Sequence, residues 1–90
     1  MQHPGLNCYP DNGGDTVGTG PDPISEEMFL AACKEACIAQ ESCEGIVRVT
    51  HNDDDLFPIP GNCSLRKNLQ IENCEKNTIY TLHVKVEGTI

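Results

Sequence analysis

Alternation of apolar and polar residues near the C-terminus is the clearest structural pattern in this chain. Over residues 78–86 the apolar and polar positions alternate as Tyr80, Leu82, Val84 and Val86 against Thr81, His83, Lys85 and Glu87. Because neighbouring side chains of a strand point to opposite faces of a sheet, this period of two predicts a strand with one buried and one solvent-facing side. Residues 43–50 and 62–67 are predicted to form two further strands.

A helix is predicted before the strand at residues 43–50. Ser25 is a favoured N-cap residue, and Glu26 and Glu27 place negative charge at the positive end of the helix dipole. Residues 28–40 are mostly strong helix formers. One face of the helix follows the spacing i, i+4, i+7, i+8 and is expected to be buried: Phe29, Cys33, Ala36 and Cys37.

Turn-forming residues mark two long loops. Residues 10–23 contain four glycines and three prolines, with at most a short extended piece at Thr16 and Val17. The polar run 51–55 and the proline- and glycine-containing segment after it predict a second exposed loop, which reaches residue 61.

The predicted elements define an α+β fold, in which a single helix packs on a small, mostly antiparallel sheet. We assign residues 8–87 to one domain, with residues 1–7 as an N-terminal tail and residues 88–90 as a C-terminal tail. A chain of 90 residues without Trp and with two Phe has little material for a core, so covalent crosslinks are a natural supplement.

The charge balance restricts the partners. Fourteen acidic and six basic side chains give a formal charge of −8. Nucleic acids and anionic membrane surfaces both require a positive protein face, so neither is expected as a partner. No apolar stretch approaches the roughly 20 residues that span a bilayer, and we expect no membrane insertion. The acidity favours solubility or a basic partner.

The six cysteines are the strongest indication of the compartment. An even number in so short a chain is typical of a disulfide framework and hence of a secreted or cell-surface protein. The alternative is a structural zinc site, but such sites favour C-x2-C pairs, and this chain has C-x3-C and C-x5-C. Residues 1–5 lack the basic and apolar regions of a signal peptide, so we expect that a natural signal has been removed.

The cysteine spacing resembles that of the PAN/apple domain family. Cys33 and Cys37 lie in a C-x3-C pair on the single helix, Cys43 begins the next strand, and Cys63 lies in a Cys-Ser-Leu stretch. The glycine-rich residues 13–15 are also similar to the family, and the resemblance covers roughly residues 8–86. The chain departs from the family in having no aromatic residue soon after Cys43 and in placing its last cysteine before the final strand rather than after it.

The resemblance implies a disulfide pattern and a function. Six cysteines allow fifteen pairings. The resemblance implies Cys33–Cys63, Cys37–Cys43 and Cys8–Cys74. It also implies an extracellular binding and adhesion module for a protein or carbohydrate ligand. The alternatives are a structural or self-assembly domain of a multi-domain extracellular protein, and a small secreted effector. The oligomeric state stays open.

Two further features are candidate surface sites. Basic residues on three predicted strands are expected to form a ligand-binding strip on the solvent-facing side of the sheet: Arg48, Arg66, Lys67 and Lys85. The alternative is ordinary solubilising charge. Asn62 begins the N-glycosylation sequon Asn62-Cys63-Ser64.

Metal binding and catalysis are not expected. The run Asp53 to Asp55 lacks the glycine and the closing glutamate of an EF-hand, so we interpret it as a solvated loop. Asp11 and Asp15 are interpreted as turn residues for similar reasons. The three histidines are scattered and no serine or cysteine nucleophile has an evident histidine partner, so we expect neither a cofactor nor enzyme activity.

Overall fold

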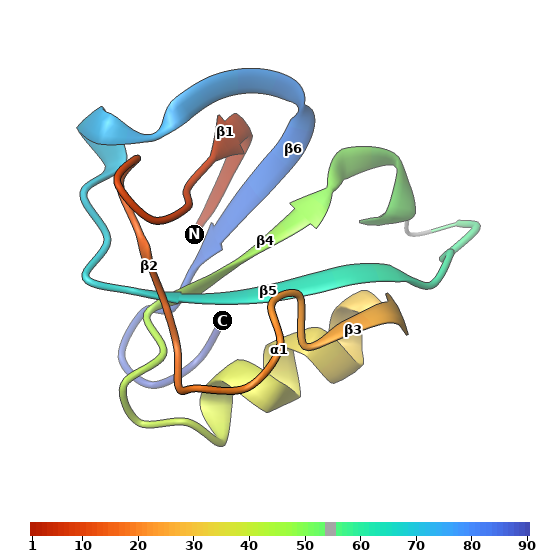
Figure 1. Ribbon diagram of the computed structural model, residues 1–90. Coiled ribbons are helices and arrows are strands. Elements are labelled where there is room, and N and C mark those ends of the chain that lie inside the picture. Colours follow the sequence, from red (N-terminus) through yellow and green to blue (C-terminus); the bar gives the residue numbers. More distant parts are fainter. Residues whose placement is uncertain (54–55) are drawn as a thin grey trace.

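The computed structural model describes residues 1–53 and 56–90, which form one helix on an antiparallel sheet (Figure 1). The strands are β1 (Gln2–Asn7), β2 (Asp15–Thr16), β3 (Ser25–Met28), β4 (Gly45–Val49), β5 (Gly61–Lys67) and β6 (Glu75–Val84). The helices are α1 (Leu30–Ile38) and two short 3₁₀ helices, η1 (Thr50–Asp53) and η2 (Ile71–Asn73). The predicted α+β class, with its single α-helix, is confirmed.

The sheet order is β1-β6-β4-β5-β2, and β3 also pairs with β5. Each of these strand pairs is antiparallel. The central strand β4 separates two apolar clusters. The helix-side cluster contains Val17, Ile46, Leu65 and four cysteines, and the other contains Val47, Leu82, Cys8 and Cys74. Half-cystines therefore supply much of the core of this small domain.

Three disulfides connect the elements. Cys33–Cys63 joins α1 to β5, and Cys37–Cys43 closes the turn from α1 towards β4. Cys8–Cys74 joins the residue that follows β1 to the residue that precedes β6. This is the pairing that the resemblance to PAN/apple domains implies, and all six cysteines are buried. Cystines of this density in a small domain are typical of extracellular proteins.

The predicted helix start at Ser25 is wrong. Ser25 lies in β3, opposite Cys63 of β5, and the helix begins only at Leu30. Sheet pairing therefore overrides the local N-cap pattern, and the Ser25 hydroxyl accepts a hydrogen bond from the Glu27 amide within the strand instead. Phe29 precedes the helix and is 48% exposed, whereas it was expected in the buried helix face.

The alternation over residues 78–86 predicts only part of the burial on β6. Leu82 is buried as expected, but Thr81 and His83 are buried too. Their face of the strand is covered because η1 packs against it, and the Thr50 and Thr81 hydroxyls lie 2.7 Å apart. Val86, expected to be buried, is 44% exposed and lies beyond the strand.

Residues 1–7 are not a tail. Residues 2–7 form the edge strand β1, which pairs with β6 from Gln2 opposite His83 to Asn7 opposite Glu75. The backbone of Met1 exchanges two hydrogen bonds with Val84. The C-terminal residues also contribute, since Ile90 packs against the helix-side cluster. Within the described residues, no helix has the length and apolar character needed to cross a membrane.

Candidate binding surfaces

The predicted basic strip does not form. Arg48 and Arg66 are buried, with side-chain exposures of 0% and 6%, and each pairs with a carboxylate at 3.0 Å, Asp53 and Asp22 respectively. Lys67 and Lys85 are half-buried, and the Lys85 ammonium group lies near two backbone carbonyls at the end of α1. Loops and β3 cover the arginines, which the strand pattern alone could not show. The arginines are therefore structural residues.

Arg48 organises one end of the molecule. Its Nε donates to Asp53 Oδ1, and its Nη1 donates to the carbonyls of Met28, Gly61 and Asn62. Met28 ends β3, Asp53 ends η1, and Gly61 begins β5. A single buried guanidinium thus fixes the chain on both sides of residues 54–60, together with the strand that leads into Phe29.

Asp53 is the second member of this arrangement. Its Oδ2 lies 2.8 Å from His83 Nε2, so the carboxylate joins η1 to both β4 and β6. Burial raises the pKa of Asp53, but the hydrogen bonds from His83 and Arg48 outweigh burial and hold the pKa below its ordinary value. The expectation of a solvated acidic run is therefore wrong for Asp53. Asp54 and Asp55 lie outside the described residues.

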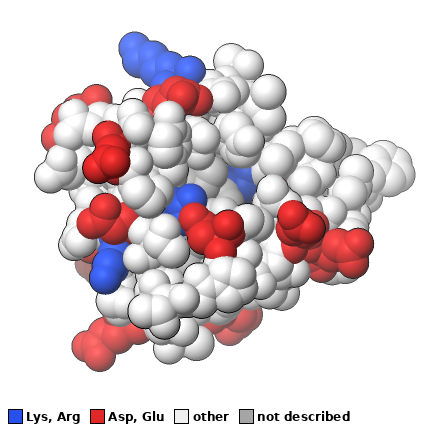
Figure 2. All heavy atoms as spheres, viewed as in Figure 1, with Lys and Arg blue, Asp and Glu red and all other residues white. Residues whose placement is uncertain are grey.

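A group of exposed apolar residues lies beside this anchor, and we call it the apolar end: Phe29, Leu56, Phe57, Pro58, Ile59 and Pro60. Leu56 and Phe57 are 82% and 73% exposed. Met28 pairs with Gly61, so Phe29 reaches the same end of the β3–β5 pair as the loop that precedes Gly61. Both phenylalanines of the chain are therefore outside the core. In Figure 2 this end of the molecule is a mostly white projection, with acidic side chains beside it over β3.

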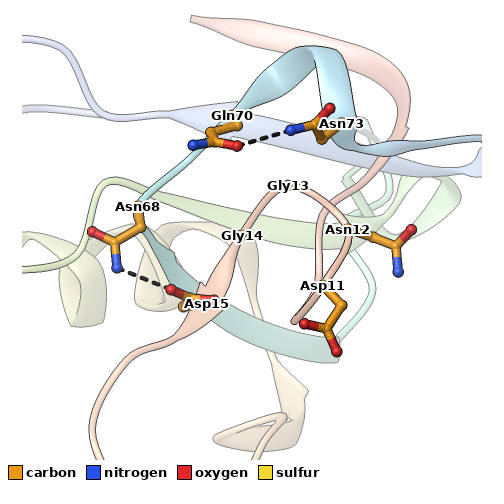
Figure 3. Close-up of a pocket in the computed structure, with 8 residues that line it drawn as sticks. All are labelled: Asp11, Asn12, Gly13, Gly14, Asp15, Asn68, Gln70 and Asn73. Atoms are coloured by element: carbon orange, nitrogen blue, oxygen red, sulfur yellow. Dashed lines mark hydrogen bonds between the residues drawn. The ribbon is translucent and has the colours of Figure 1, made fainter.

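A polar hollow of about 500 Å³ lies at the other end of β5. It is lined by Asp11, Asn12, Gly13, Gly14, Asp15, Asn68, Gln70 and Asn73. Figure 3 shows Asn68 and Asp15 meeting on one side of the glycine backbone, and Gln70 and Asn73 meeting on another. The sequence did indicate Asp11 and Asp15, but as turn residues. Their association with residues 68–73 comes from the β2–β5 pairing, from hydrogen bonds between the two segments and from contact with Cys74, and local sequence pattern could not show it.

Asn62 is exposed although it lies in a central strand. Its backbone carbonyl accepts a hydrogen bond from Arg48, and its neighbour Cys63 is fully buried in a disulfide. The side chain is thus accessible to glycosylation, which stays a prediction.

These features define a small, disulfide-stapled α+β domain with one apolar and one polar surface feature at opposite ends of β5. Comparison with protein-family models, with curated proteins and with solved structures finds no match to the chain.

Proposed function

We propose that this chain is an extracellular binding module that docks onto another protein through its apolar end. The observation that carries the proposal is the exposure of both phenylalanines on an anchored scaffold. In a chain this poor in apolar core material, leaving two aromatic rings in water costs stability that burial would provide. Exposed apolar groups of this kind mark interaction sites, and aromatic residues are frequent binding hot spots. The resemblance of the cysteine spacing to PAN/apple domains supports the same class of function.

The apolar end is also prepared for binding. Pro58 and Pro60 restrict the backbone, and Arg48 holds the chain on both sides of the loop. A segment whose flanks are fixed before binding loses less conformational entropy when it docks. The loop therefore suits insertion of Leu56 and Phe57 into an apolar recess of the partner.

Charge favours a basic partner over a second copy. Two of the six cationic side chains are the buried arginines, while Glu26 and Glu27 are exposed directly before the apolar end. Two copies of this chain would each bring a formal charge of −8 to the contact. A partner with basic residues around its recess gains attraction where a second copy meets repulsion. Self-assembly is therefore the second candidate.

Site-specific photo-cross-linking tests the proposal. Benzoylphenylalanine is placed at position 57 or, as a control, at position 79, because Ile79 is another exposed apolar residue and lies on β6. Each protein is exposed to the secreted proteins of its source. We expect a specific adduct at position 57 alone, and the purified partner should bind wild-type protein at least about tenfold more tightly than Phe57→Ser.

Other outcomes contradict the proposal. Equal cross-linking at both positions, or equal affinity of the partner for wild type and Phe57→Ser, would remove the apolar end as the docking surface. A position-57 adduct between two copies, together with a dimer in analytical ultracentrifugation that Phe57→Ser abolishes, would establish self-assembly instead.

A further inference from the structure

The polar hollow provides hydrogen-bond acceptors without any positive charge of its own. Two of its eight lining residues are carboxylates, four are carboxamides and two are glycines. None is Lys, Arg or His, so an anionic ligand would meet uncompensated repulsion. The hollow has a volume of about 500 Å³ and is open to solvent, since most of its polar lining residues are exposed.

Neither Lys67 nor Arg66, the cations of the adjoining part of β5, forms an ion pair with the carboxylates of the hollow. Lys67 pairs with Asp15 in the β2–β5 register but makes no ion pair with it. The Arg66 guanidinium is occupied by the Cys8 carbonyl and by Asp22. Among the described residues, the Asp11 carboxylate and the Asn12 carboxamide have no hydrogen-bond partner, and only one Asp15 oxygen is used, by Asn68.

We propose that the hollow binds the guanidinium or ammonium group of an arginine or lysine side chain in a peptide ligand. Asp11 supplies the main counter-charge and Asp15 the second, while the carboxamide oxygens accept the remaining N–H groups of the cation. Calcium fits less well, because it takes six to eight oxygen ligands, usually with several carboxylates. Within the described residues, no three His, Cys, Asp or Glu side chains are grouped for a metal ion.

The floor of the hollow is held in place before a ligand arrives. The Gly13 carbonyl accepts a hydrogen bond of 2.8 Å from the Gln70 amide. A Cβ at Gly13, whose φ is +84°, would lie 2.5 Å from the Cys74 sulfur and 2.7 Å from the Gln70 carbonyl, so the loop and the disulfide are in close contact. The backbone beneath the proposed cation site is therefore fixed before a ligand binds, which reduces the conformational entropy lost on binding.

This site is independent of the apolar end. The hollow adjoins Lys67 and Asn68 at one end of β5, whereas the apolar end adjoins Gly61 at the other. Loss of binding at one location therefore does not imply loss at the other.

Two-dimensional ¹H–¹⁵N NMR titration tests the proposal with N-acetyl-arginine-N-methylamide as the probe. We expect saturable shifts of the amides at residues 11–15 and 68–73, with a Kd of about 1 mM. The neutral isostere N-acetyl-citrulline-N-methylamide should not shift them. Asp11→Asn/Asp15→Asn should weaken the arginine probe about tenfold, since each ion pair contributes modestly. Glu26→Gln/Glu27→Gln removes the same charge from β3 and should leave the Kd unchanged.

Several results would overturn the assignment. These are an absence of saturable shifts, equal weakening by the β3 control, or equal binding of the citrulline probe. Saturable calcium binding at the same amides that excludes the arginine probe would identify a metal site instead. If the double variant loses its dispersed spectrum, Asp11→Asn alone decides the matter. Asn tolerates the positive φ of 70° at this position, and the Asp11 carboxylate has no hydrogen-bond partner among the described residues.

Discussion

His83 and Asp53 are thirty residues apart in the sequence, yet His83 Nε2 lies 2.8 Å from Asp53 Oδ2 in the folded chain. The other oxygen of the same carboxylate accepts a hydrogen bond from Arg48. These contacts attach η1 to the sheet at the point where the chain leaves for the apolar end. The stability of the domain and the position of its proposed docking loop therefore depend on the same three side chains.

Replacing Asp53 with asparagine should weaken this attachment without changing the shape of the side chain. The amide retains one acceptor but places a donor beside either Arg48 or His83. We expect a loss of about 1–3 kcal/mol in the free energy of unfolding, measured by urea denaturation with the disulfides intact. Glu41→Gln, at an exposed position, is the matched control and should change stability by less than about 0.5 kcal/mol. Equal stability of Asp53→Asn and wild type would show that the carboxylate does not hold η1.

Asp53 should also give the domain an acid-sensitive stability. Its folded-state pKa is lowered from 3.8, so the unfolded state binds the proton at a higher pH than the folded state does. Asp53 thus contributes its full stability above the unfolded value, and this contribution is lost as the pH falls through the folded value. The difference in unfolding free energy between wild type and Asp53→Asn should shrink over that range.

The difference in unfolding free energy between wild type and Asp53→Asn is the quantity to follow, because the contributions of other carboxylates cancel in it. The pKa of Glu75 is also lowered, by hydrogen bonds from Asn77 and Tyr9, and both proteins retain it. A difference that stays constant from neutral pH down to below pH ~3 would contradict the role assigned to Asp53.

Arg48→Lys should affect the apolar end specifically. Lysine keeps the charge, but its single ammonium group cannot reproduce the bonds that the planar guanidinium of Arg48 makes to Asp53 and to three backbone carbonyls. We expect a loss of about 2 kcal/mol and faster amide hydrogen exchange at residues 61–63, near the carbonyls that Arg48 binds.

Arg66→Lys is the matched control for this experiment. Arg66 lies on β5 and is also buried, but it contacts the Cys8 carbonyl and Asp22 near the hollow. Its replacement should accelerate exchange around residues 8–16 instead. The same exchange pattern in both variants would mean that the two arginines act only through global stability.

The disulfides should differ in what they contribute. Cys8–Cys74 spans 66 residues and Cys37–Cys43 spans 6. In the chain-entropy model these bonds contribute about 4 and about 2 kcal/mol respectively. The paired alanine variant Cys8→Ala/Cys74→Ala should therefore lower the thermal unfolding temperature more than Cys37→Ala/Cys43→Ala does. The reverse order would show that local strain or denatured-state structure outweighs loop length.

Part of the framework could be predicted from the sequence because its causes are local: the run of alternating residues identified β6. The three disulfides join distant residues, and the resemblance to PAN/apple domains, rather than local pattern, implied their pairing. The errors arise where distant segments decide. Ser25 has the properties of an N-cap, but its segment pairs with β5 before the helix can begin.

The candidate sites were harder to predict for the same reason. From the sequence alone, the basic and polar residues of a strand are predicted to face solvent, but another segment of the chain can cover them. Arg48 and His83 are covered by η1, which follows β4 directly but has no apolar pattern of its own. Residues 11–15 and 68–73 are far apart in the sequence, and the β2–β5 pairing, the hydrogen bonds between the two segments and their contacts with Cys74 bring them together.

The pairing of β1 with β6 has a mechanical consequence. Met1 is bonded to Val84, so the N-terminus and the C-terminal end of β6 lie side by side. Tension between them would unzip the two strands one residue pair at a time, a geometry that resists force weakly. The crosslink at Cys8 would stop the unzipping, because it joins the bases of both strands. The unit would then lengthen under load by a fixed amount while the sheet beyond the crosslink stays folded.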